Sequence, residues 1–180
     1  MKKLFYWLIV SIVLIVSTTC FSHVAFAQSF SLGGGVPYNL DIEIPGINLR
    51  GYYNAGETFC FGPEFIFFFP KKEIHGNKET EIKIQEFNFN AHYIFELSKN
   101  VGVYPLVGLN YTLEKEETTY LNQTLKEEDL IKSFGVNLGG GIHFPISNFV
   151  PFLEYEYVLG DLSENIITIG AFFIIGKEEE

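Results

Sequence analysis

Residues 87–113 carry the clearest alternation of apolar and polar positions in the chain. Every second residue is apolar over 87–97, and the pattern resumes over 101–113 after a very short turn. Because successive side chains of a strand point to opposite faces, each run predicts a strand with one apolar and one polar face. Both runs are roughly twice as long as the mean strand of about 5 to 6 residues in soluble sheets. This is the length that a tilted strand needs to cross a bilayer.

The same alternation of apolar and polar residues in the rest of the chain predicts further strands, enough for a closed barrel. A slip of phase near Gln85 and Glu86 indicates a bulge, and no segment has the period of an amphipathic helix. Loops are expected at residues 39–46, 70–81 and 114–129, opposite much shorter turns, and an even strand count returns both chain ends to one side. We therefore expect an all-β, eight-stranded antiparallel up-and-down barrel, with strands at residues 30–37, 47–53, 59–69, 87–97, 101–113, 130–144, 149–159 and 166–175.

The N-terminus has the anatomy of a secretory signal peptide. Lys2 and Lys3 precede an apolar run over residues 4–16, and Ala-Phe-Ala follows at 25–27. The run is shorter than the roughly 20 residues of a spanning helix, which favours cleavage before Gln28 over a retained anchor. The predicted division is a cleaved signal peptide at 1–27, a barrel at 28–176 and an acidic tail at 177–180.

Charge and cysteine content narrow the function further. Loss of residues 1–27 removes two lysines and no acid, which leaves 10 Lys+Arg against 22 Asp+Glu and a net charge of −12. Such a chain lacks the basic face that nucleic acid requires. Cys20 would allow lipidation, but Thr18 and Thr19 precede it in place of small Gly or Ala residues. Only Cys60 then survives processing, so no intramolecular disulfide can form, and a closed sheet protects its strands by leaving no edge.

Strand number, turn asymmetry, signal peptide and the aromatic face together resemble the small OmpA-like and OmpX-like outer-membrane barrels. The resemblance implies a transmembrane barrel in the outer membrane of a Gram-negative-type bacterium, with short periplasmic turns and longer extracellular loops. It also implies a monomer whose partners are outer-membrane lipid, lipopolysaccharide and the outer-membrane assembly machinery. That machinery is thought to read an aromatic residue at the end of the final strand, whereas Phe172 and Phe173 are here followed by Ile174, Ile175 and an acidic tail.

The polar faces of the strands predict a network inside the barrel. Arg50 is the only arginine, and a buried charge needs partners, for which Glu64, Glu154 and Glu156 are the candidates. The network is either an ion or proton path or a salt-bridge plug, and the narrow interior of eight strands favours the plug over a general pore. The predicted lumen residues are Arg50, Glu64, Asn88, Asn90, His92, Asn110, Asn137, His143, Glu154 and Glu156. Interfacial aromatic girdles are expected from Tyr52, Tyr53, Phe69, Tyr93, Tyr104, Tyr111, Tyr155 and Tyr157.

Two alternatives to a non-enzymatic membrane barrel remain. A soluble periplasmic lipocalin-like barrel would bind lipid and turn its apolar face inward. A lipid-modifying outer-membrane enzyme would need a serine, a histidine and a carboxylate in register, but neither H-x-S nor G-x-S-x-G occurs. No H-x-H, C-x-x-C or H-E-x-x-H metal motif occurs either. We predict no catalytic residue, metal or cofactor, and Cys60 as a small inward-facing filler.

The two long predicted loops carry most of the remaining chemistry. Their charges fit adhesion, binding of a host factor, or cation-bridged contact with lipopolysaccharide, although charged runs are also typical of a merely solvated surface. We therefore expect either an envelope structural role or a surface-interaction role, with a possible extracellular ligand. The candidate residues are Lys71, Lys72, Glu116, Glu117, Glu127, Glu128 and Asp129.

Overall fold

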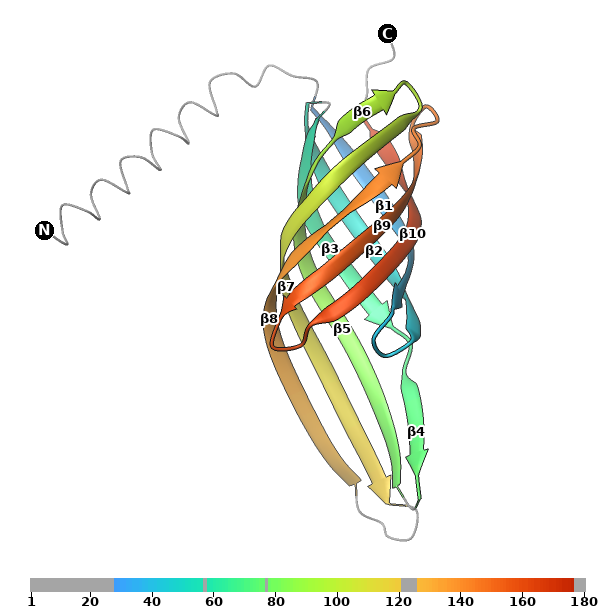
Figure 1. The fold of residues 1–180 in the computed structure, drawn as a ribbon, viewed down its shortest axis with the longest axis vertical. Coiled ribbons are helices and arrows are strands. Elements are labelled where there is room, and N and C mark those ends of the chain that lie inside the picture. Colours follow the sequence, from blue (N-terminus) through green and yellow to red (C-terminus); the bar gives the residue numbers. More distant parts are fainter. Residues whose placement is uncertain (1–27, 57, 77, 121–125, 177–180) are drawn as a thin grey trace, which may run out of the picture.

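The computed structural model describes residues 28–56, 58–76, 78–120 and 126–176 (Figure 1). No helix in these residues is long and apolar enough to cross a membrane. All strands belong to one antiparallel sheet in the order β4-β5-β3-β2-β1-β10-β9-β8-β7-β6. The described residues form β1 (Gln28–Asn39), β2 (Ile44–Ala55), β3 (Phe59–Phe68), β4 (Lys71–His75), β5 (Lys78–Tyr93), β6 (Phe95–Ser98), β7 (Val101–Tyr120), β8 (Lys126–His143), β9 (Phe149–Gly160) and β10 (Glu164–Ile175).

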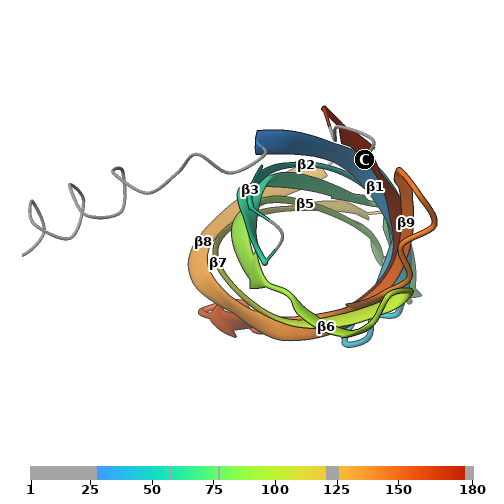
Figure 2. The same ribbon diagram turned by 90° about the horizontal axis from the view of Figure 1, so that it is seen from above.

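The sheet closes into a barrel because β5 also pairs with β7. The ring seen in Figure 2 consists of β1, β2, β3, β5, β7, β8, β9 and β10. The short β4 and β6 continue the courses of β3 and β5. Phe30 of β1 lies opposite Ile175 of β10, so the barrel begins and ends at the same end, the terminal end. The predicted eight-stranded up-and-down barrel is confirmed.

Apolar side chains cover the outside of the barrel. Phe134, Leu109 and Leu49 are 78 %, 66 % and 64 % exposed, and each has a buried polar neighbour on the strand, Ser133, Asn110 and Arg50 respectively. Outward aromatic rings pack across strands, with 4.1 Å between the ring centroids of Phe65 and Phe87. The lipocalin-like alternative is wrong, because it requires this apolar face to point inward.

The interior is layered along the barrel axis. One apolar cluster lies towards the end opposite the termini and consists of Ile44, Ile66, Phe68, Ile84, Val158 and Ile166. A second lies towards the terminal end and consists of Tyr52, Cys60, Val150, Phe152 and Phe172. Arg50 and its acids lie between the two clusters, whereas Glu86 and Glu164 lie beside the first, as register partners of Ile66 and Val158. The apolar layers were not anticipated from the sequence, in which the inner face reads as polar.

The phase of the sequence pattern differs from expectation in β5 and β6. Ile84, Glu86 and Asn88 are all buried, so β5 keeps one phase and the bulge predicted near Gln85 and Glu86 is wrong. The inward-facing Ile84 is apolar, which made the alternation look interrupted. The irregularity lies instead between Glu96 and Ser98, where β6 shifts register against β7.

Four strands continue past the barrel and form an extension sheet (Figure 1). It consists of β4 with residues 78–84 of β5, 114–120 of β7 and 126–134 of β8. The loops predicted at 70–81 and 114–129 are therefore wrong over most of their length. The loop predicted at 39–46 is shorter than expected, a turn at residues 40–43, since β1 ends at Asn39 and β2 begins at Ile44. Glu and Lys are weak strand formers, but opposite charges on adjacent strands stabilise the sheet here.

Candidate functional site

An ion-pair cluster lies between the two apolar layers. Arg50 of β2 donates from Nη2 to Glu64 Oε1 at 2.5 Å and from Nη1 to Glu154 Oε1 at 2.8 Å. Glu64 is the β3 partner of Arg50 in the sheet register, whereas Glu154 reaches the guanidinium from β9. The guanidinium also lies 4.7 Å from the ring centroid of Phe152. Since all three charged side chains are buried, each charge depends on its partners in place of water.

A third carboxylate joins this cluster through an amide. Asn90 Nδ2 donates to Glu64 Oε2 and to Glu156 Oε2, both at 3.1 Å. Asn48 Nδ2 donates to Glu64 Oε1 at 2.6 Å. Glu64, Glu154 and Glu156 form the carboxylate cluster, in which one ligand oxygen from each lies within 4.8 Å of the others. Glu156 makes no ion pair with Arg50, unlike the other two acids.

Two further buried acids lie nearer the extension sheet. Asn88 and Asn110 donate to Glu86 Oε2 at 3.4 and 3.2 Å, and the Asn39 amide donates to Glu164. Neither acid was predicted as a lumen residue. Glu86 could have been found, because it stands in phase with Asn88 once the supposed bulge is removed.

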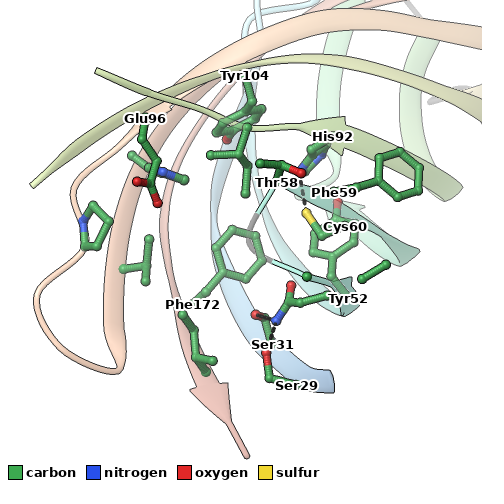
Figure 3. A pocket seen from close by; sticks show the side chains of 18 of the residues that line it. Ser29, Ser31, Tyr52, Thr58, Phe59, Cys60, His92, Glu96, Tyr104 and Phe172 are labelled. Carbon is green, nitrogen blue, oxygen red and sulfur yellow. Dashed lines mark hydrogen bonds between the residues drawn. The ribbon is translucent and has the colours of Figure 1, made fainter. Parts of the chain in front are cut away.

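A cavity of about 630 Å³ opens at the terminal end of the interior (Figure 3). His92, Tyr104 and Cys60 line it, and Tyr104 donates from its hydroxyl to Glu154 Oε2 at 2.9 Å. The ring of His92 stacks on that of Tyr104, with 4.7 Å between centroids. Cys60 Sγ lies 3.7 Å from His92 Nδ1, and His92 Nε2 lies 3.7 Å from Glu154 Oε2. The second distance exceeds that of a hydrogen bond, so these groups do not form the proton relay of a catalytic triad.

The structure places nine of the ten predicted lumen residues in the buried interior. His143 is half-buried and lines the cavity at the terminal end. The girdle prediction is wrong for Tyr52 and Tyr104, which are buried inside the barrel. The inward position of Tyr52 could have been predicted from the sequence, because it stands two residues after the inward-facing Arg50 on the same strand.

The predicted surface residues lie on strands of the extension sheet. On its outward face Lys115 Nζ lies 2.8 Å from Glu117 Oε1 and 3.3 Å from Glu128 Oε2, while Lys83 Nζ lies 3.3 Å from Glu117 Oε1. Hydrogen bonds from Lys115 and then Lys83 lower the pKa of Glu117. Lys72 pairs with Glu79 at 2.9 Å. The candidates are distributed as Lys71 and Lys72 on β4, Glu116 and Glu117 on β7, and Glu127, Glu128 and Asp129 on β8.

A closed barrel with an apolar outer belt and a buried polar layer inside defines a transmembrane β-barrel. The model of the outer membrane protein beta-barrel domain family matches residues 12–171. The chain belongs to this family, which places it in the outer membrane of Gram-negative-type bacteria. The terminal end, with its short turns, accordingly faces the periplasm, and the extension sheet faces the exterior.

Solved structures share the fold at low sequence identity. The attachment invasion locus protein Ail of Yersinia pestis is 21 % identical with a TM-score of 0.56, covering 82 % of this chain and 97 % of Ail. The N-terminal β-barrel domain of Pseudomonas aeruginosa OprF is 13 % identical with a TM-score of 0.54, covering 83 % and 98 %. A major outer membrane protein of Thermus thermophilus is 13 % identical with a TM-score of 0.64, covering 83 % and 100 %. Ail is also known in complex with the heparin analogue sucrose octasulfate. No curated protein matches the chain in sequence.

Proposed function

We propose that this protein is a non-enzymatic surface-interaction barrel that binds an extended segment of a partner protein through its extension sheet. The observation that carries the proposal is an open strand edge. Residues 126–134 of β8 pair with β7, but the pairing of β8 with β9 begins only at Gly135. Within the described residues, one side of this stretch therefore presents unpaired backbone donors and acceptors, which an added strand can engage.

Side chains along this edge support an apolar contact in addition to backbone hydrogen bonds. Leu130 and Ile131 are exposed large apolar residues beside the edge. The ion pairs on the outward face, between Lys83, Lys115 and the neighbouring glutamates, hold the extension sheet in shape. A rigid scaffold of this kind lowers the entropy that a partner must lose on binding.

Charge favours a protein segment over a polyanion as the partner. The described strands of the extension sheet carry seven lysines and nine acids, from Lys71 to Lys132. This balance differs from the basic surface that a sulfated ligand requires. The heparin analogue bound by Ail therefore serves here as a comparison ligand, for which we expect weaker binding than for a peptide strand.

The remaining parts of the proposal concern the lumen and the envelope. We infer that the interior is closed to solutes, because Arg50 with its acids lies between two apolar clusters, and eight strands leave room for side chains only. Planar-bilayer recordings should then show no stable conductance. Export by a cleaved signal peptide, contact with lipopolysaccharide, insertion by the assembly machinery and a monomeric state belong to the same proposal.

Shortening the extension sheet in register tests the surface role. Leu113 lies opposite Lys132, so replacing residues 114–131 by Asn-Gly removes Leu130 and Ile131 and joins the two strands through a favoured hairpin turn. We expect the variant to reach the outer membrane and to show the heat-dependent gel shift of a folded barrel. Cells that carry it should lose attachment to cultured epithelial monolayers, whereas heparin-coated beads should bind wild type and variant equally weakly.

A charge variant separates the strand edge from the acids that line it. The variant changes Glu127 and Glu128 to Gln and Asp129 to Asn, which removes the charges and keeps the strand edge. Attachment should persist in this control. Attachment that survives the shortened hairpin, or that disappears with the charges alone, would refute the strand-edge proposal.

A further inference from the structure

We propose that the carboxylate cluster of Glu64, Glu154 and Glu156 holds one divalent cation of the calcium type inside the barrel. The acids of the cluster outnumber its cations. Arg50 is the only guanidinium of the chain, and it pairs with Glu64 and Glu154 but not with Glu156. Three carboxylates against one guanidinium leave two negative charges in a buried site, which is the charge that one divalent cation balances. This inference is independent of the role of the extension sheet.

The geometry of the cluster suits a hard cation. One oxygen from each of the three carboxylates lies within 4.8 Å of the others. Calcium binds oxygen at about 2.3–2.6 Å in flexible geometry, so ligands of a single ion lie at most about 5 Å apart. All donors here are oxygen atoms, which select calcium or magnesium over softer metals. Calcium fits better, since magnesium usually keeps several waters and this site is buried.

Unpartnered polar atoms at the cluster point independently to a missing ligand. Tyr52 follows Arg50 on the same inward face of β2; it is 2 % exposed, and its hydroxyl has no hydrogen-bond partner. Glu156 Oε1 also has no partner, although the side chain is 4 % exposed. Asn48 Oδ1 has none either, although the same amide donates to Glu64. Buried polar groups without partners are costly, and a cation supplies contacts for the oxygen atoms.

A cavity extends from the periplasmic end towards the cluster. The cavity of about 630 Å³ at the terminal end is lined by Tyr52, His92 and Tyr104. The Tyr104 hydroxyl, at 2.9 Å, and His92 Nε2, at 3.7 Å, both face Glu154 Oε2. Tyr104, which lines the cavity in Figure 3, therefore also contacts Glu154 of the carboxylate cluster. The charged or titratable groups around the cluster are Arg50 and Tyr52 of β2, Cys60 and Glu64 of β3, Glu86 and His92 of β5, Tyr104 of β7, Glu154 and Glu156 of β9, and Glu164 of β10.

The test measures calcium-dependent stability and terbium luminescence on the full-length barrel extracted from outer membranes in detergent. Calcium should raise the unfolding temperature above its value in EDTA, and terbium should give saturable emission sensitised by Tyr52 and Tyr104. Glu156→Gln removes one ligand and one unbalanced charge. We expect it to weaken terbium binding by on the order of tenfold or more, to abolish the response to calcium, and to unfold in EDTA no lower than wild type.

The control is Glu127→Gln with Glu128→Gln, which removes acids from the exposed extension sheet and should leave both readouts unchanged. If this control loses terbium binding and the calcium response to the same extent, the cation binds at the surface and the proposal is overturned. The same follows if Glu156→Gln keeps the wild-type response, or if wild type shows no response to calcium. It is also overturned if mild acid in EDTA stabilises wild type while calcium does not, because protons then neutralise the cluster.

Discussion

Removing the Arg50 guanidinium should cost more stability than any other single charge deletion in the barrel. Arg50→Met leaves Glu64 and Glu154 buried, without the cation that now lies 2.5 and 2.8 Å from their oxygens. Loss of one partner from a buried ion pair costs about 3–5 kcal/mol. The two charge-assisted hydrogen bonds, at about 1.5–3 kcal/mol each, give the same order of magnitude. We expect the free energy of unfolding to fall by about 3–5 kcal/mol.

The assay is urea unfolding of the barrel in lipid vesicles, followed by the gel shift between folded and unfolded bands. EDTA is present throughout, so that no added cation replaces the guanidinium. The triple variant Arg50→Met, Glu64→Gln, Glu154→Gln is the control, because neutral side chains of similar volume need no charge partner, and it should recover most of the loss. A loss for Arg50→Met below about 1 kcal/mol, the range of exposed pairs, would refute the buried ion-pair argument.

Three further predictions concern the wall, the outer belt and the extension sheet. A Cβ at Gly62 would overlap the Gly51 carbonyl oxygen, so Gly62→Ala should cost about 1–3 kcal/mol in urea unfolding; Gly51→Ala, whose Cβ would meet only a Leu32 methyl at 3.7 Å, should change it little. Leu109→Lys on the exposed outer belt should lower the free energy of unfolding by about 2–4 kcal/mol in lipid vesicles. The same change at Leu130, in the extension sheet, should cost much less, so equal costs at the two positions would contradict the membrane placement. The lowered pKa of Glu117 in the folded chain means that its contribution is present above the unfolded pKa and is lost as pH falls through the lowered value. After correction for the intrinsic slowing of amide exchange in acid, the protection factors of residues 114–120 should therefore fall before those of the barrel amides, and Glu117→Gln should remove this pH dependence.

Alternation sufficed to predict the barrel, because lipid outside and a narrow interior impose opposite chemistry on the two faces of every strand. Residues 59–68 illustrate this, since Phe59, Phe65 and Phe67 are exposed on the outside while Cys60 and Glu64 face inward. The single arginine likewise identified its partners Glu64 and Glu154. A buried arginine can pair only with acids that also face the interior, and few acids of the predicted strands do so.

The extension sheet could not be predicted in the same way. Once strands leave the membrane, both faces meet water, so the apolar–polar alternation disappears and Glu-rich and Lys-rich runs look like loops. Their pairing depends on cross-strand contacts such as Lys115 with Glu128, which only the register reveals. The inward apolar layers escaped prediction for a related reason. Ile84 and Phe68 face the interior, so their hydrophobicity does not distinguish the inner from the outer surface.

The layered interior also determines how the barrel can open. If the lumen is closed as proposed, water from the cavity at the terminal end should reach the ion pairs of Arg50 only after the cluster of Phe152 has separated, because that cluster lines the cavity. Partial hydration from one end therefore gains nothing until an entire layer is lost. The barrel should consequently unfold slowly and in one step, and the strand segments around Arg50 should exchange their amide hydrogens only through global unfolding.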